Sequence, residues 1–413
     1  MLKTIGEQAK IAEMAMHKID IDTKNRLLKL AGDNLVAQTR DILAANQIDM
    51  NKGKASGMSQ GLLDRLSLTP ERIQAMATGL EKLIKLENPV GEIVKTTKRP
   101  NGLLICQKRV PLGVVGIIYE ARPNVTTDAF GLCFKTGNVV ILKGGSDAIN
   151  SNKAIVDCIR ATLVSQGIDA NIVQLIEDTS RQATIEFMKM KQYIDVLIPR
   201  GGAGLIQAVV DNSTIPVIET GTGNCHIYVD ESADLQMATN IIVNAKTQRI
   251  GVCNTCESLL VHEQAKDTLL PMVAVVLSEY NVEIRGDATV CAIIANAKNA
   301  TEDDWGREYL DYIISIKIVS SVDEAIQHIN KYSTKHSESI ITSDENCAEQ
   351  FLDEVDSAAV YVNASTRYTD GEEFGFGAEI GISTQKLHAR GPMGLEALTT
   401  TKYIIYGEGQ VRP

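Results

Sequence analysis

The spacing of hydrophobic positions changes several times along the chain, and each change predicts a different kind of structure. Up to about Leu86, apolar residues recur every three or four positions, which is typical of amphipathic helices. The pairs Asp22-Thr23 and Thr69-Pro70 have the residue types that begin helices. This first stretch is therefore predicted to be a helical scaffold that flanks a sheet.

The stretch from Gly91 to Pro111 changes to an alternating pattern. Two alternating segments lie on either side of Arg99-Pro100-Asn101-Gly102, and Asn-Gly is a strong signal for a hairpin turn. A two-stranded ribbon is only marginally stable by itself. We therefore expect a hairpin that packs against a neighbouring subunit.

After Pro111 the pattern changes again, to short continuous apolar runs separated by helical stretches. The predicted strands cover residues 113–119, 139–142, 172–176, 194–198 and 215–218, and the predicted helices include 148–163 and 181–190. Continuous apolar strands that alternate with helices indicate a parallel sheet covered on both faces. Such sheets bind ligands at the carboxyl ends of their strands, and glycines gather at those ends. No GxGxxG motif is present, so the glycines alone are weak evidence for a nucleotide site.

A second series of the same kind follows. Strands are predicted at 225–229, 257–261, 292–294, 312–319, 337–342 and 358–363, and helices at 235–245, 262–277, 322–332 and 345–352. The tail is rich in glycine from Gly371 to Gly394 and ends in a predicted edge strand at 400–405. We therefore predict an α/β fold with two Rossmann-like parallel-sheet domains and a small β unit. One sheet domain comprises residues 1–90 and 112–224, the second 225–397, and the β unit 91–111 and 398–413.

Composition narrows the class of protein. The chain has 413 residues, which favours two domains or more. Its net charge of -11 argues against a general nucleic-acid binder, since phosphate contacts need an excess of Lys and Arg. The N-terminus is an acid-containing amphipathic helix rather than a signal peptide, and no apolar run reaches membrane-spanning length. The eight cysteines are scattered, as thiols of a reducing compartment are, so we expect a cytoplasmic protein.

Cys253 is the candidate nucleophile. A helical pattern precedes it and the apolar run Leu259–Val261 follows it, so it is predicted to lie at a turn just after Gly251. A free thiol has a pKa of about 8.5, and the reactive form is the thiolate, so such a site needs local positive potential. The alternative is a small buried cysteine that only packs.

Four stretches, read together, resemble the aldehyde dehydrogenase superfamily. They are Arg109–Thr126 (RVPLGVVGIIYEARPNVT), Gly137–Ala148 (GNVVILKGGSDA), Arg249–His262 (RIGVCNTCESLLVH) and Val360–Leu395, and the resemblance extends over nearly the whole chain. Within the superfamily, the last stretch resembles the acyl-phosphate reductases of proline biosynthesis. The resemblance implies NADPH-dependent reduction of L-glutamyl 5-phosphate to L-glutamate 5-semialdehyde and phosphate, through a thioester on a cysteine. It also implies that the first sheet domain binds NADP(H), that the second is catalytic, and that the β unit serves oligomerisation.

The resemblance assigns roles to individual residues. Cys253 matches the nucleophile, and Asn124 matches the side chain that, with the Cys253 backbone N–H, donates to the oxyanion. Lys143 matches the lysine that bonds the adenosine ribose or its 2′-phosphate. Ser146 stands where relatives that prefer NAD tend to carry an acid, which favours NADP(H). Without the resemblance, Asn124 would be interpreted as a turn residue and Lys143 as a solvated charge.

Further cofactor contacts follow from the same resemblance. Gly201, Gly202 and Gly204 match the turn and helix start over which the pyrophosphate lies. Glu308 matches the glutamate that bonds the nicotinamide ribose, and its alternative is a surface acid. Glu219 lies 34 residues before Cys253, where ordinary aldehyde dehydrogenases place the base that activates water. An acyl-phosphate reductase does not need that base, so Glu219 is either a proton relay or a structural remnant.

The substrate and the remaining cysteine leave alternatives open. Arg249, Ser365, Arg367 and Arg390 are the candidates for the substrate's charged α-carboxylate and α-amino groups, since a guanidinium suits a carboxylate. The spacing Cys253-x-x-Cys256 permits a regulatory disulfide. It does not predict a metal site, because zinc needs two further ligands.

The sequence leaves two rival functions open, and both differ in testable ways from the acyl-phosphate reductase. The first is another aldehyde dehydrogenase acting on a different aldehyde or acyl substrate, which Glu219 favours. The second is a catalytically silent binding protein with the same fold. The expected partners are a small-molecule substrate, a second copy of the chain and the upstream glutamate kinase.

Overall fold

The computed structural model describes residues 2–412 and divides the chain into two compact units. The first unit runs up to Thr220 and also includes Gly375–Gly381 and the segment from Met393 onward. The second comprises Gly221–Phe374 and Ile382–Pro392. Residues 375–381 and 393–397, which the sequence pattern placed with the second domain, thus pack with the first unit.

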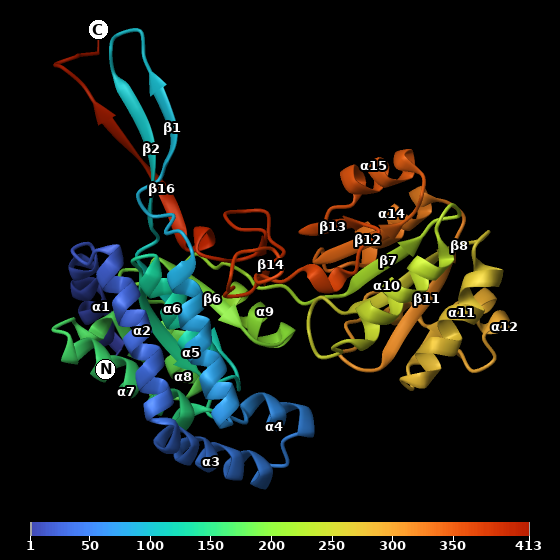
Figure 1. Cartoon of the computed structure of the whole chain (residues 1–413), viewed down its shortest axis with the longest axis horizontal. Helices are drawn as coiled ribbons and strands as arrows, with labels where there is room; N and C mark the ends of the chain where they lie inside the picture. The colour runs from blue at the N-terminus through green and yellow to red at the C-terminus, as the bar shows by residue number, and fades with distance from the viewer. Residues whose placement is uncertain (1, 413) are drawn as a thin grey trace. The chain divides into compact units, whose positions relative to one another are not determined.

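The first unit begins with five helices. They are α1 (Leu2–Met16), α2 (Ile21–Ala37), α3 (Thr39–Ala55), α4 (Gln60–Leu66) and α5 (Pro70–Lys85). Figure 1 shows α2 and α5 side by side, and each buries one mainly apolar face. The predicted start at Thr69-Pro70 is confirmed, since Thr69 caps α5 by accepting from the Arg72 N–H. The cap of α2 is Asp20, which lies earlier than the predicted start at Asp22.

The sheet of the first unit is wholly parallel. Its strands are β3 (Val114–Tyr119), β4 (Val139–Gly144), β5 (Val173–Leu175) and β6 (Val196–Arg200), in the order β5-β4-β3-β6. The accompanying helices are α6 (Asn124–Lys135), α7 (Ile149–Ser165), η1 (Ala170–Ile172), α8 (Arg181–Phe187) and α9 (Ala203–Asn212). The predicted strand at 215–218 is wrong, because only a single bridge joins Val217 to Leu197. Pro216 lies within that run and has no N–H to donate to a ladder.

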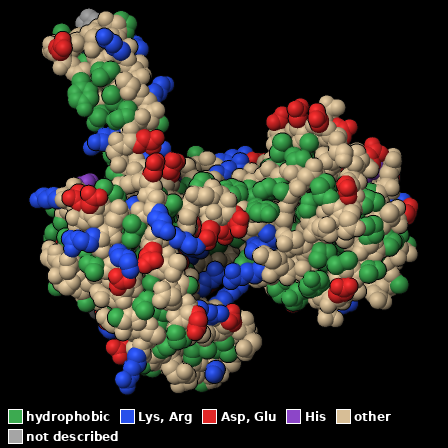
Figure 2. Space-filling model, in the orientation of Figure 1, with side chains coloured by type: hydrophobic (Ala, Val, Ile, Leu, Met, Phe, Trp, Pro, Cys, Tyr) green, Lys and Arg blue, Asp and Glu red, His purple; other side chains and the backbone are tan. Residues whose placement is uncertain are grey.

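The predicted hairpin and edge strand form one antiparallel sheet. Its strands are β1 (Ile93–Lys98), β2 (Leu104–Pro111) and β16 (Thr399–Tyr406), in the order β1-β2-β16. The Gly102 N–H donates to the Arg99 carbonyl at 3.0 Å, and Gly102 has a φ of +91°, which glycine adopts without strain. Both predictions are confirmed. Figure 2 shows hydrophobic side chains gathered over this sheet.

The second unit is built on a longer parallel sheet. Its strands are β7 (Cys225–Val229), β8 (Cys256–His262), β9 (Glu283–Gly286), β10 (Lys298–Asn299), β11 (Ile313–Val319), β12 (Ser337–Ile341) and β13 (Ala359–Val362), in the order β10-β9-β11-β8-β7-β12-β13. Its helices are α10 (Leu235–Thr247), α11 (Lys266–Glu279), α12 (Ala288–Ile293), α13 (Glu302–Trp305), α14 (Val322–Tyr332) and α15 (Glu345–Glu354). Two apolar clusters cover its faces, as expected for parallel strands.

One strand prediction in the second unit is wrong. The apolar run at 292–294 lies at the end of helix α12, and the strand at this place in the chain is β9. Asp287 caps α12 by accepting from the Val290 N–H at 2.9 Å, and Val290 is fully buried. A three-residue apolar run fits a buried helix as well as a strand.

The remaining elements are short. They are η2 (Thr366–Tyr368), β14 (Ile382–Ser383), β15 (Gly391–Pro392) and η3 (Glu396–Leu398). The predicted α/β class, with two parallel sheets and a small antiparallel sheet, is confirmed. Within residues 2–412, no helix combines the length and the apolar character needed to span a membrane.

Candidate active site

Cys253 lies on the loop between α10 and β8, which confirms the turn that the sequence predicted. Its side chain is partly exposed, whereas Cys256, the first residue of β8, is completely buried. Burial raises the pKa of the Cys256 thiol to about 12. Both cysteines are thiols in the structure. The two sulfurs of the Cys-x-x-Cys spacing therefore have very different access to solvent.

The backbone of this loop is held by side chains from distant parts of the second unit. The Cys225 thiol donates to the Cys253 carbonyl at 3.2 Å, and the Thr366 hydroxyl donates to the Asn254 carbonyl at 2.8 Å. Within the loop, the Thr255 hydroxyl donates to the Arg249 carbonyl at 2.7 Å. Three carbonyls of the loop are thus satisfied by side-chain donors, which fixes the loop's conformation.

Gly223 packs directly against the loop that contains Cys253. A Cβ atom at Gly223 would lie 1.4 Å from the Cys253 carbonyl oxygen, so only glycine fits at this position. The Gly223 N–H donates to the Glu308 carboxylate at 2.8 Å. Glu308, predicted as a cofactor ligand, therefore binds the backbone of Gly223, and Gly223 in turn contacts the Cys253 loop.

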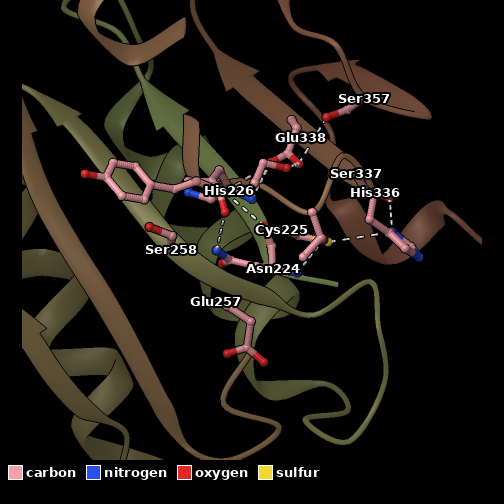
Figure 3. Close-up of polar contacts among 12 residues, drawn as sticks. Asn224, Cys225, His226, Glu257, Ser258, His336, Ser337, Glu338 and Ser357 are labelled. Atoms are coloured by element: carbon pink, nitrogen blue, oxygen red, sulfur yellow. Dashed lines mark hydrogen bonds and ion pairs between the residues drawn. The ribbon is translucent and has the colours of Figure 1, made fainter. Parts of the chain in front are cut away.

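Behind the loop lies a buried polar network, drawn in Figure 3, that the sequence analysis did not identify. The His336 Nδ1 lies 2.7 Å from the Ser337 hydroxyl and 3.8 Å from the Cys225 sulfur. Burial lowers the pKa of His336 to about 4 and raises the pKa of Cys225 well above its ordinary value. The imidazole is therefore neutral at pH 7, and the Cys225 thiol keeps the proton that it donates to Cys253.

The same network holds Glu338, which is completely buried beside His226. The Glu338 carboxylate accepts from the His226 N–H and from the hydroxyls of Ser333 and Ser357. Cys225-His226 was visible in the sequence only as part of a strand. No sequence signal indicated that Cys225 and His226 contact His336 and Glu338, because the partners lie more than 100 residues apart.

Two of the predicted substrate residues lie near Cys253. Burial and the neighbouring Arg249 guanidinium lower the pKa of Arg367, and Cys253 contributes to its electrostatic environment. The Arg367 Nε donates to the Gln248 side chain at 2.8 Å. The Arg367 guanidinium, with Arg249 close to it, therefore provides positive potential near Cys253, and such potential in general stabilises a thiolate and attracts an anionic substrate.

The Asn254 side chain joins the loop to the segment that contains Ser365 and Arg367. Its amide donates to the Thr369 carbonyl at 2.9 Å and to the Arg367 carbonyl at 3.3 Å. Ser365 is buried and its hydroxyl accepts from the Arg367 N–H. The residue after the predicted nucleophile thus holds two of the predicted substrate residues in place.

Arg390 has a different environment. Its guanidinium donates to the Asp356 carboxylate at 2.8 Å, and Lys335 and Lys386 bind the same carboxylate. These three cations lower the pKa of Asp356. Arg390 is thus held in an ion-pair cluster that includes none of the other predicted residues.

The predicted residues of the first unit gather at the carboxyl ends of its strands. Lys143 lies near the end of β4, with its ammonium on the Gly144 carbonyl at 3.2 Å, and burial lowers its pKa. Ser146 follows on the next turn and is partly exposed. Asn124 is the exposed first residue of α6, and its amide donates to the Asp128 carboxylate at 3.2 Å. Glu219 is partly exposed and lies in a segment without regular secondary structure.

The glycines before α9 form a close-fitting turn. The Gly202 N–H donates to the Glu120 carboxylate at 3.0 Å, and a Cβ atom at Gly201 would lie 2.6 Å from a Glu120 oxygen. A Cβ atom at Gly204 would meet nothing within 4 Å. This helix start therefore already binds an anionic oxygen through its backbone.

The model of the aldehyde dehydrogenase family matches residues 2–305 and 305–404. The chain belongs to the aldehyde dehydrogenase family, whose members use nicotinamide cofactors.

Within that family, the similarity is to gamma-glutamyl phosphate reductases, and it extends over the full length. The enzyme of that name from Lachnospira eligens is 61% identical over 411 residues, which is 100% of this chain and 99% of the relative. The crystal structure of the Thermotoga maritima enzyme superimposes with a TM-score of 0.97 at 50% identity and covers 100% of both chains. The resemblance inferred from the four sequence stretches is thereby confirmed.

More distant structures share the fold alone. An engineered glycolyl-CoA reductase with bound NADP+ has a TM-score of 0.70 at 16% identity, covering 98% of this chain and 96% of its own.

Proposed function

We propose that this protein reduces L-glutamyl 5-phosphate to L-glutamate 5-semialdehyde and phosphate with NADPH, the second step of proline biosynthesis from glutamate. Full-length similarity to gamma-glutamyl phosphate reductases supports the reaction. The observation that favours the cysteine mechanism is the partly exposed thiol of Cys253. It lies on a loop held by side-chain hydrogen bonds, near Arg367 and its neighbour Arg249.

In the proposed mechanism, the Cys253 thiolate attacks the acyl carbon of the substrate. The bond to the phosphate oxygen breaks, phosphate leaves with that electron pair, and a thioester remains on Cys253. NADPH, when bound, would supply a hydride for the thioester carbon. Cleavage of the C–S bond would then release the aldehyde and restore the Cys253 thiolate. Phosphate rather than water is the acyl partner, so no general base for water is required.

Two donors are proposed for the oxyanion that forms in each addition. They are the Cys253 backbone N–H and the Asn124 side-chain amide, and loss of one such donor typically costs about 2.7–4 kcal/mol of transition-state stabilisation. One N–H of the Asn124 amide is used on Asp128, which leaves its second N–H for the substrate. We propose that Glu219 is a proton relay or a structural remnant.

The residues of the first unit fit NADP(H). The Gly202 N–H aims at an anionic oxygen, and side chains at Gly201 would fill the same space, as expected of a pyrophosphate cradle. We propose that Lys143 binds the adenosine ribose and its 2′-phosphate, next to Ser146, and that Glu308 binds the nicotinamide ribose.

For the substrate's α-carboxylate and α-amino group, we propose ligands from the segment beside Cys253. Arg249 and Arg367 supply positive charge close to the thiol, and Ser365 is tied to Arg367. Arg390 remains a fourth candidate. To bind the substrate, its guanidinium would have to break its ion pair with Asp356.

We further propose that the enzyme is a cytoplasmic homo-oligomer. The three-stranded sheet exposes apolar side chains on β1 and β16, among them Ile93, Val94, Ile405 and Tyr406. Both strands lie at edges of that sheet, and exposed apolar edges favour pairing with another chain. The second proposed partner is the upstream glutamate kinase, which supplies the acyl phosphate.

The test is NADP⁺ reduction with glutamate-5-semialdehyde, measured with and without inorganic phosphate. The protein should form NADPH only with phosphate, and Cys253→Ser should form none. Cys347→Ser alters another partly exposed thiol, on α15, and serves as the matched control. Turnover that ignores phosphate would make Glu219 a working base and the protein an ordinary aldehyde dehydrogenase. Cofactor binding without turnover would indicate a silent member of the fold.

A further inference from the structure

A cavity of 630 Å³ lies in the first unit, at the amino ends of its strands. Its wall includes Gly137, which lies two residues before β4, and Pro111, the last residue of β2. The proposed NADP(H) residues lie at the opposite, carboxyl ends of the same strands. Because β3 and β4 have six residues each, the two places are separated by roughly 15–20 Å. The cavity is therefore not part of the proposed cofactor site.

The ammonium group of Lys24 lines this cavity. Lys24 is only 6% exposed, and a Cβ atom at Gly137 would lie 3.1 Å from its Nζ and 3.1 Å from Pro111. The charged end of the side chain, and not only its aliphatic stem, thus reaches the cavity wall. Within residues 2–412, this ammonium has no hydrogen-bond or ion-pair partner, unlike most buried charges.

The charges around Lys24 do not balance that of its ammonium. Its buried neighbour Lys135 already bonds the Asn25 side chain at 2.7 Å and the Ile84 carbonyl at 3.2 Å. Burial lowers the pKa of Lys24, the charge of Lys135 lowers it further, and the negative charge of Asp20 offsets these effects only in part. Glu87 lies in the cavity wall but forms no ion pair with Lys24. The local potential is positive, and an anion would relieve it.

The rest of the wall is mostly apolar, and the volume of the cavity suits a small molecule. The polar groups in the wall come from His17 and Asn88. The apolar surface is provided by Met16, Ile19, Ile21, Val90 and Pro111. Binding sites for small molecules typically enclose about 300–1,000 Å³, with apolar walls and a few polar groups that fix orientation.

We propose that this cavity is a second ligand site, which binds a small carboxylate with an apolar body. The carboxylate is held by the Lys24 ammonium and the body lies against the apolar wall. A single ammonium matches one carboxylate better than a phosphate dianion, which proteins usually bind with several donors. The wall also links the turn between α1 and α2 to the base of the hairpin, where the Gly91 N–H donates to the Arg109 carbonyl.

The test is calorimetric titration of the full-length protein with three probes: cyclohexanecarboxylate, the uncharged cyclohexylmethanol, and inorganic phosphate. The carboxylate should bind, and the alcohol should bind about tenfold more weakly or worse, since it lacks the charge-assisted bond. Equal affinity for the alcohol would overturn the role of the ammonium. Phosphate binding that competes at this cavity with equal affinity would overturn the ligand class.

Two variants localise the binding. Lys24→Met keeps the length of the side chain and removes its charge, and it should fold at least as stably, because it removes an uncompensated buried charge. It should bind the carboxylate about tenfold more weakly, whereas Lys18→Met, an exposed lysine of the same turn, should bind as the unaltered protein does. Val90→Trp keeps the lysine and fills the cavity, and it should also lose binding.

Hydrogen exchange provides a readout that needs no variant. Addition of cyclohexanecarboxylate should slow exchange of the amides in residues 17–24 and 87–91. Protection confined to residues 249–255 or 365–369 would place the carboxylate at the proposed active site and overturn the proposal. Undiminished binding by Lys24→Met would overturn it as well.

Discussion

Asn254→Ala should separate the positioning of the substrate from the stability of the fold. Asn254 is only 4% exposed, and its amide donates to the carbonyls of Arg367 and Thr369. The substitution leaves both carbonyls without this donor, at a cost of about 1–3 kcal/mol for each buried group. The bond to Arg367 is long at 3.3 Å. We therefore expect a loss of about 2–4 kcal/mol in the free energy of unfolding.

The effect on catalysis should be specific. Without the Asn254 amide, the segment that contains Ser365 and Arg367 is less restrained, so the guanidinium loses its fixed position beside Cys253. Loss of one charge-assisted bond to a substrate carboxylate corresponds to about tenfold or more in affinity. The KM for glutamate-5-semialdehyde should rise by about that factor, whereas the KM for NADP⁺ should change little.

The assay combines denaturant unfolding with steady-state kinetics, and Asn46→Ala is its control. Asn46 is also buried, and its amide donates to the Leu66 carbonyl at 2.9 Å and to the Ser151 hydroxyl at 3.0 Å, far along the chain from the substrate segment. It should lose similar stability without a rise in the semialdehyde KM. Equal KM changes in both variants, or none in Asn254→Ala, would refute the reasoning.

Three further predictions concern charge and close packing. Lys246→Met breaks the fully buried ion pair with Glu257 and should cost about 3–5 kcal/mol in unfolding free energy. Burial raises the pKa of Glu257 to about 7, above its unfolded value, so protonation of Glu257 stabilises the fold. The stability lost in Lys246→Met should therefore be smaller at pH 5, where Glu257 is neutral, than at pH 8, where it is charged. A loss that denaturant unfolding finds independent of pH would contradict this. Glu120→Gln removes the charge that occupies the Gly202 N–H and should lower the KM for NADPH in steady-state kinetics; an unchanged or higher KM would argue against a pyrophosphate site there. Gly223→Ala forces a methyl group against the Cys253 carbonyl and should reduce kcat/KM about 100-fold while the protein stays folded by circular dichroism; near-normal turnover would show that the conformation of the Cys253 loop is not needed for catalysis.

Local patterns in the sequence were enough for most of the fold. Thr69-Pro70 and Asn101-Gly102 specify a helix cap and a turn through their own backbone and side-chain preferences, whatever surrounds them. The failures were short apolar runs, at 215–218 and 292–294. A run of three or four residues has no resolvable period, so the choice between strand and helix depended on Pro216 and on the Asp287 cap.

The features of the candidate site also fall into those that the sequence determined and those that only the tertiary structure decided. The sequence determined the family, the turn that presents Cys253, and the residue types near it, because these follow from contiguous motifs. Only the tertiary structure decided what holds that turn: the Cys225 thiol, the Thr366 hydroxyl and the contact with Gly223. It also decided that Arg367 lies beside Arg249 whereas Arg390 pairs with Asp356. The physical reason is that hydrogen bonds and ion pairs depend on distances of a few ångströms, and the packing of strands from remote parts of the chain sets those distances.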